Sequence, residues 1–357
     1  MTVTATLTMP SIALTPTGTL SLGSQTIDQR QKAKSLWIKS LDLLESAEGV
    51  DLTKLAHFLN QLAAVYQQRG DFAKTERLFQ RLSRLAERTG VDPEMETMRP
   101  IVLRRLGSLY QAQGRYREAE DLLHRALISA QAIFAQQRGE PLTQEVAEIQ
   151  HHLAILHQER GRLGKAATYY WRALRNYQQA SSFESARTAG LYHDLSSLER
   201  KRGNVAEAEL LSNQALEIRM RIQGMMHPAV AAEMIWLAGL LTDQEKIDEA
   251  ERFYRGAIGI IESAGEDGQY EVANTLAKLA ALCLAQDRIA EAERCLLQAV
   301  AIKEKLFGIE NLEVAQLQGE LAQLYGRQSR YDEAARFSQR AHTTFIKATG
   351  PLKLEEG

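Results

Sequence analysis

One turn motif recurs along the chain at nearly constant spacing, and this repetition constrains the fold more than any other feature. Several copies share a Leu, a small residue and an aromatic residue or Leu, then a turn, then an acidic residue beside Ala. Examples are LGSLYQAQGRYREAE from Leu106 and LAALCLAQDRIAEAE from Leu279. The turn positions are Gly70, Gly114, Gly161, Gly203, Glu245, Asp287 and Ser329. Their spacings of 44, 47, 42, 42, 42 and 42 residues indicate a chain that stacks one structural unit.

Each unit is predicted to be a helical hairpin, because apolar residues recur at helical spacing on both sides of the turn. Eight residues before the turn stands a Leu, and a small residue follows it, as in Leu237 and Ala238. Five residues after the turn a small residue stands again, as at Ala250. Small side chains on both helices let the two axes approach closely. The prolines expected between hairpins are Pro93, Pro100, Pro141 and Pro228.

The chain is expected to have three segments. Residues 1–27 contain no charged side chain and are rich in Thr and Ser, which predicts a disordered tail. Residues 28–350 are predicted to form the array, with a leading helix over 28–48 and seven hairpins with turns near 70, 114, 161, 203, 245, 287 and 329. Residues 351–357 are predicted to be a C-terminal tail. The fold class is therefore all-α, since no hairpin can bury its apolar face without its neighbours.

The unit resembles the tetratricopeptide repeat, and more narrowly the 42-residue variety of kinesin light chains. The resemblance covers about residues 28–350. The segment ALEIRMRIQGMMHPAVAAEMIWLAGLL, with its Gly224 loop and the following His-Pro pair, is similar to that family's link between repeats. Glu245 and Asp287 depart from the usual turn Gly. The resemblance implies a right-handed α-solenoid of about seven units plus a leading half-repeat, and a role in binding peptides or proteins.

No motif for catalysis is found, so the chain is predicted not to be an enzyme and to have no catalytic residue and no cofactor. The segment GRLGK from Gly161 lacks the outer Gly and the Ser/Thr of a phosphate-binding loop. His152 and His157 would point about 140° apart on a helix and could not share a small ion. No metal site is therefore predicted, although zinc between His151 and His193 stays open as an alternative. Cys283 and Cys295 are expected to be buried free thiols, with a disulfide between them conceivable.

Charge and composition exclude other classes of protein. The net charge is −2 and no dense basic cluster exists, so no nucleic-acid partner is expected. No apolar run approaches the roughly 20 residues that span a bilayer, and the N-terminus lacks the basic and apolar regions of a secretory signal. These features predict no membrane span and a cytoplasmic location. Two cysteines in 357 residues cannot form a disulfide framework.

The concave face of such an array is lined by the first helix of each hairpin. In the family that the chain resembles, the groove positions stand 13, 10, 6 and 3 residues before the turn, on one helix face. The candidate binding residues are Asn60, Gln67, Arg104, Ser108, Gln111, His151, Gln158, His193, Ser197, Arg200 and Ile235. Amides, Arg and His dominate the first four repeats, and small or apolar residues follow in repeats five and six. This pattern suits an extended peptide with acidic groups, and Arg104 is expected to face solvent.

The sequence therefore predicts a non-enzymatic scaffold or adaptor that binds a peptide segment or a partner protein in the concave groove, with an acidic partner favoured. The alternative is a regulatory repeat protein that senses a peptide, changes its superhelical shape and releases an effector. The oligomeric state is left open.

Overall fold

The computed structural model describes residues 52–88, 93–137, 140–179 and 185–349. The expected N-terminal tail, the leading helix over 28–48 and the C-terminal tail lie outside these residues. Fourteen α-helices and one short 3-10 helix make up the described part, which contains no strand. The prediction of an all-α fold is confirmed.

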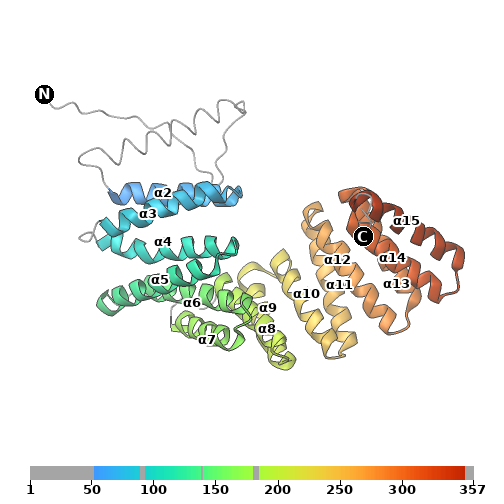
Figure 1. Ribbon diagram of the computed structural model, residues 1–357. Coiled ribbons are helices and arrows are strands. Elements are labelled where there is room, and N and C mark those ends of the chain that lie inside the picture. The colour runs from blue at the N-terminus through green and yellow to red at the C-terminus, as the bar shows by residue number, and fades with distance from the viewer. Residues whose placement is uncertain (1–51, 89–92, 138–139, 180–184, 350–357) are drawn as a thin grey trace, which may run out of the picture.

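The helices pair in chain order, and successive pairs stack into a curved α-solenoid (Figure 1). We number the pairs as repeats one to seven. They are α2 (Leu52–Gln68) with α3 (Phe72–Arg88), α4 (Pro93–Ala112) with α5 (Tyr116–Gln137), α6 (Glu140–Glu159) with α7 (Leu163–Gln179), α8 (Ala186–Lys201) with α9 (Val205–Gln223), α10 (Pro228–Asp243) with α11 (Ile247–Ala264), α12 (Gln269–Ala285) with α13 (Ile289–Phe307), and α14 (Leu312–Arg327) with α15 (Tyr331–Thr349). The 3-10 helix η1 (Glu266–Gly268) links repeats five and six.

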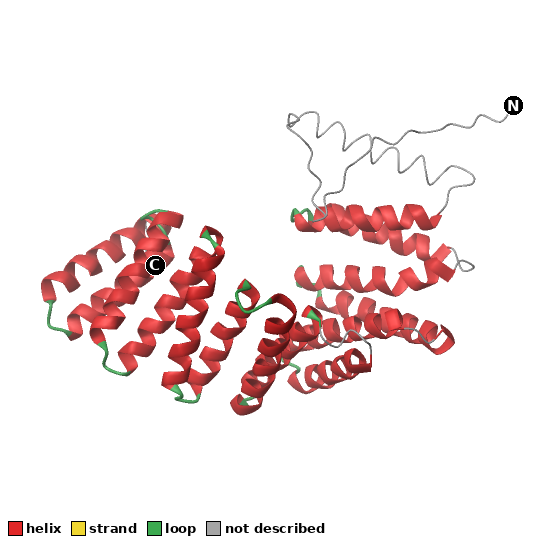
Figure 2. Cartoon of the chain, turned by 180° about the vertical axis from the view of Figure 1, so that it is seen from behind, coloured by secondary structure: helices red, strands yellow, loops and turns green. Residues whose placement is uncertain are grey.

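Short loops join these helices wherever the connection is among the described residues (Figure 2). Each hairpin turn contains one residue with positive φ, from +57° at Ser329 to +84° at Gly203. The chain reverses there because the amide after the turn residue bonds back into the first helix, as Arg115 N does to Tyr110 O at 2.8 Å. Glycine occupies this position in repeats one to four, whereas Glu245 and Asp287 adopt the same left-handed conformation with a side chain. None of the described helices is long and apolar enough to cross a membrane.

The core lies between the helices, where the repeated small residues allow close packing. Ala238 on α10 and Ala250 on α11 are fully buried in repeat five. At Gly107 in repeat two, an added Cβ would lie 3.0 Å from Leu123 Cγ, so a methyl group would fit only if the Leu123 side chain shifted. The repeated Leu fills the space toward the next repeat, and Leu237 is 1% exposed. Burial of these stripes explains why the hairpins stack instead of standing apart.

The expected position of the prolines is correct except at Pro100. Pro93 and Pro228 begin α4 and α10, and Pro141 is the second residue of α6, where a missing N–H is tolerated. Pro100 lies inside α4, which begins at Pro93 and so extends one to two turns before it.

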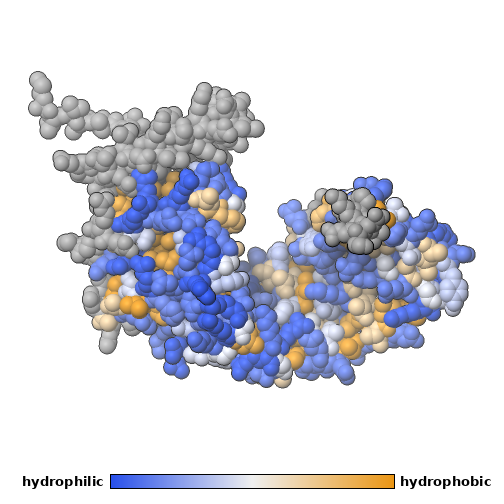
Figure 3. Space-filling view, in the orientation of Figure 1, coloured by the Kyte–Doolittle hydropathy of each residue, from blue (hydrophilic) through white to orange (hydrophobic). Residues whose placement is uncertain are grey.

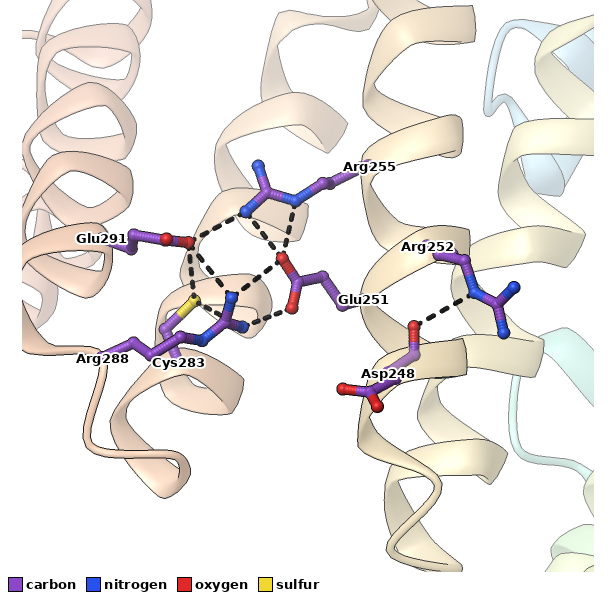
Figure 4. Close-up of polar contacts among 7 residues, drawn as sticks. All are labelled: Asp248, Glu251, Arg252, Arg255, Cys283, Arg288 and Glu291. Carbon is purple, nitrogen blue, oxygen red and sulfur yellow. Dashed lines mark hydrogen bonds and ion pairs between the residues drawn. The ribbon is translucent and has the colours of Figure 1, made fainter.

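Consecutive repeats are joined by a recurring ion pair, which we call the repeat clip. The carboxylate six residues after one turn contacts the basic residue directly after the next turn. The pairs are Glu76–Arg115, Glu120–Arg162, Glu209–Lys246, Glu251–Arg288 and Glu293–Arg330. Figure 4 shows the Glu251–Arg288 clip, which Arg255 and Glu291 extend into a network. Each partly exposed pair contributes at most about 1 kcal/mol, but the clip recurs in register along the array.

The junction between repeats three and four lacks the clip. Ala167 stands at the carboxylate position of repeat three, and Asn204 stands at the basic position of repeat four. Glu199, four residues before the turn of repeat four, accepts hydrogen bonds from Arg202 Nη1 and Asn204 Nδ2, both at 2.7 Å. Both donors belong to repeat four, so these bonds do not reach repeat three. Helices α7 and α8 also form the most loosely packed consecutive pair among the described helices. The junction between repeats three and four is therefore joined less firmly than its neighbours.

Candidate functional site

The first helices of the repeats line the inner side of the curve. Helix α4 contacts both α2 and α6 as well as its own partner, and α6 contacts α8, which places these helices on the more tightly curved side. Figure 3 shows the hollow that the array encloses between its two halves. The candidate binding residues all belong to these first helices.

Arg104 is not free to meet a ligand. Its Nε lies 2.7 Å from Glu145 Oε1, and its Nη2 lies 2.7 Å from Glu148 Oε2, both on α6 of the next repeat. Burial would lower the pKa of Arg104, but the bonds to these two carboxylates raise it. The side chain is 12% exposed, so the expectation that Arg104 faces solvent is wrong. The cause is the pair of acidic residues that the next repeat presents to it.

The two candidate histidines are also paired with carboxylates of the next repeat. His151 Nε2 lies 2.6 Å from Asp194 Oδ2, and His193 Nδ1 lies 3.0 Å from Glu233 Oε2. Burial acts to lower the pKa of His193, but the hydrogen bond and the charge of Glu233 outweigh it and raise the pKa. In the described part of the chain, no group of metal-ligating side chains includes His151 or His193. The zinc site considered between them has no geometric support.

Trp236 packs across the face of α8 that carries His193 and Arg200. Its indole N–H donates to Ser196 Oγ at 2.8 Å, and its ring lies 5.1 Å from the His193 ring and 5.2 Å from the Arg200 guanidinium. Arg200 Nε contacts Asp243 Oδ2 at 2.7 Å on the same helix as Trp236. These contacts join repeats four and five. The polar groups of His193 and Arg200, which were predicted to line the groove, therefore already have partners in repeat five.

The groove amides make similar bonds. Asn60 Oδ1 accepts from Arg105 Nη1 at 2.7 Å, and Gln111 Nε2 donates to Glu159 Oε2 at 2.9 Å, each between neighbouring repeats. Gln158 Oε1 accepts from the Tyr170 hydroxyl at 3.0 Å within its own hairpin.

The remaining candidates are Ser108, Gln67, Ser197 and Ile235. Ser108 Oγ donates to the backbone of its own helix at Arg105 O, 2.9 Å away. Gln67 is exposed, and Ser197 and Ile235 are half-buried. The candidates therefore lie on the first helices of the repeats, but six of the ten polar ones already bond to another repeat.

An open pocket lies further along the concave side, between α12 and α14. Its volume is about 380 Å³, and its apolar lining includes Ala277, Ala281 and Leu284. These residues stand 10, 6 and 3 positions before the turn, where the sequence predicts small and apolar groove surface. These three residues were not among the predicted binding residues, although their positions before the turn are groove positions.

Charged side chains border this pocket. Lys278, Glu320 and Arg327 stand one residue from groove positions. The Lys278 side chain is exposed and forms no hydrogen bond or ion pair with the described residues. Partial desolvation by the neighbouring protein and, to a smaller extent, the charge of Arg200 lower the pKa of Lys278. Because the Lys278 side chain is exposed, it is accessible to a ligand.

Known family models match the repeat region of the chain. Models of the tetratricopeptide repeat match residues 55–89, 102–136, 146–184 and 188–222, and also 230–305 and 271–347. No curated protein matches the chain.

Solved structures share the fold. BtubC (BKLC) from P. vanneervenii is 25% identical with a TM-score of 0.59, over 66% of this chain and 92% of that protein. The apo form of RapI is 12% identical with a TM-score of 0.55, over 83% and 99% of the two chains. A signal transduction ATPase with a tetratricopeptide-repeat sensor, from Pyrococcus horikoshii, is 15% identical with a TM-score of 0.57, over 89% of this chain and 49% of that one. The latter two show the fold alone.

Proposed function

Because the chain belongs to the tetratricopeptide-repeat family, whose repeats mediate protein–protein interaction, we propose that it is a non-enzymatic adaptor that binds an extended segment of a partner protein. The segment would lie along the concave side of the array. Recognition of this kind combines backbone hydrogen bonds with one or two side-chain anchors.

The pocket between α12 and α14 is the observation that carries this proposal. A lining of Ala and Leu accepts an apolar side chain, and the pocket's volume of about 380 Å³ suits one or two such groups. Lys278 lacks a partner among the described residues and can donate to a carboxylate of the same segment. An acidic peptide with an apolar anchor therefore fits this end of the groove best.

The polar positions of repeats one to four take a secondary role in this proposal. An acidic ligand at Arg104 would have to displace Glu145 and Glu148, which are already in place and cost nothing to order. Gln67 is exposed, so its amide is available to a peptide backbone. We infer that repeats six and seven hold the anchor and that the earlier repeats extend the contact.

The test is selection of binding peptides from a random library on the purified full-length chain, followed by measurement of affinity for the selected peptide. Lys278→Glu should weaken binding at least about tenfold, since a charge-assisted bond is lost and repulsion is added. Arg294→Glu is the matched control, because Arg294 is also exposed but belongs to α13, the second helix of the same repeat. Equal losses from the two variants, or none from Lys278→Glu, would exclude the pocket as the anchor site.

One observation favours the alternative of a peptide sensor that changes shape. The junction between repeats three and four lacks the repeat clip, so a ligand that contacts both halves can shift their relative orientation. Small-angle scattering of the free chain and of its complex with the selected peptide tests this. A changed radius of gyration supports the sensor, and an unchanged one supports a rigid adaptor.

A further inference from the structure

Three positions converge at the junction between consecutive repeats. They stand 6 and 10 residues after one turn and 4 residues before the next. Between repeats one and two these are Glu76, Gln80 and Tyr110, which bond to one another. Gln80 Nε2 donates to Glu76 Oε1 at 3.0 Å and contacts the Tyr110 hydroxyl at 3.1 Å, and that hydroxyl donates to Glu76 Oε1 at 3.0 Å.

Between repeats two and three the same positions hold Glu120, His124 and His157. Each offers one ligand atom, and these atoms lie within 4.8 Å of one another. No hydrogen bond found among the described residues joins the three side chains, in contrast to the equivalent triad of repeats one and two. His157 is 1% exposed, and its Nδ1 is buried with no hydrogen-bond partner in the described part of the chain. A buried polar atom without a partner is costly unless a ligand satisfies it.

We propose that Glu120, His124 and His157 bind a Zn²⁺ ion that links repeats two and three. Two imidazoles and one carboxylate are a common zinc ligand set, with water at the fourth position. Glu120 and His124 are four residues apart on α5 and therefore share a helix face, and His157 approaches from α6.

The geometry requires only a small adjustment. Zinc bonds of about 2.0–2.2 Å place tetrahedral ligand atoms roughly 3.3–3.6 Å apart, so the side chains must close in by about 1 Å. Glu120 and His124 are half-buried and can move by this amount. Tyr169 covers the cluster: its ring stacks on His157 at 5.5 Å and meets the His124 ring edge-on at 6.3 Å.

Two arginines oppose the ion and limit its affinity. Arg160 and Arg162 both form ion pairs with Glu120, so the carboxylate is shared with existing cations. Their side chains are 23% and 40% exposed and can turn toward solvent when zinc binds. The affinity should therefore be weaker than that of a closed structural zinc site.

The experiment titrates the full-length chain with ZnCl₂ by calorimetry and follows the melting temperature, with MgCl₂ as the control salt. The test variant is the double substitution His124→Gln and His157→Tyr, which installs the residues that repeats one and two carry at these positions. Because that triad bonds internally, the variant should fold and stay stable without metal. His342→Gln, at an exposed histidine on α15, is the control for weak surface binding.

The wild type and His342→Gln should each bind zinc at this site and melt at a higher temperature in its presence, because a ligand of the folded state stabilises it. The double variant should bind one zinc fewer per chain and lose the thermal shift. The proposal is overturned if the wild type binds no zinc, or if the double variant retains the same stoichiometry and the same shift.

Discussion

At the scale of the residue, the hairpin turns show how backbone conformation alone affects stability. Glu245 and Asp287 have φ of +60° and +58°, and no side-chain hydrogen bond to the described residues holds them there. A left-handed conformation costs a residue with a Cβ about 1–2 kcal/mol, which is more than glycine loses in chain entropy. We expect Glu245→Gly and Asp287→Gly each to stabilise the chain by about 0.5–1 kcal/mol in urea unfolding.

The matched control reverses the change in a neighbouring repeat. Gly203 has φ of +84°, and an added Cβ would meet no atom within 4 Å. Gly203→Ala should therefore destabilise by about 1 kcal/mol through backbone strain alone. A neutral Gly203→Ala together with a destabilising Glu245→Gly would show that φ does not govern these turns.

His193 carries a pH signature. Its pKa in the folded chain is raised because the bond to Glu233 outweighs burial. The group therefore stabilises the fold fully below its unfolded pKa of about 6.5, and this contribution is lost as pH rises through the higher folded pKa. The melting temperature of wild type should exceed that of His193→Gln most clearly near pH 6, and the gap should narrow above pH 8. A gap that widens with pH would contradict the assigned direction.

At the scale of the element, the distance between paired helices depends on small side chains. Ala250 and Ala292 are fully buried between the helices of repeats five and six. Replacing either with Leu should destabilise by about 1–3 kcal/mol, because a close contact has no space for three more heavy atoms. Ala264→Leu, at the exposed end of α11, should be nearly silent in the same denaturation assay. Equal effects at the three sites would refute the helix register.

Arg104 joins α4 to α6 and is predicted to be a structural residue. Its removal would leave Glu145, which is 9% exposed, without its main partner. Breaking one side of a buried ion pair costs about 3 kcal/mol or more. Arg104→Gln should therefore lower the free energy of unfolding by about that amount. Arg294→Gln, at an exposed position, should change it by less than about 0.5 kcal/mol.

At the scale of the whole molecule, stiffness varies along the array because one junction lacks its clip. Ala167→Glu combined with Asn204→Arg would place a carboxylate and a base at the positions that form clips elsewhere. Hydrogen exchange of α7 and α8 should slow, with a gain of at most about 1 kcal/mol. Glu251→Ala, which removes an existing clip, should speed amide hydrogen exchange in the helices at the junction of repeats five and six. No change in either variant would show that the clips do not control stiffness.

The period, the hairpins, the turn positions and the close contacts at Ala250 and Gly107 could be read from the chain alone. They depend on local spacing, since helical periodicity and the conformation of a turn involve residues that are near in sequence. The groove register was also predictable, because it follows from the same helical spacing.

The environment of each groove residue could not be predicted in this way, because it depends on how one repeat is offset against the next. That offset pairs Arg104 with Glu145 and Glu148, leaves Lys278 without a partner among the described residues, and opens the pocket between α12 and α14. The same offset brings His157 to Glu120 and His124 on the preceding hairpin. Helical spacing in the sequence relates His157 only to the histidines of its own helix. Contacts between residues about 40 positions apart are set by the superhelix, and no local pattern specifies its pitch.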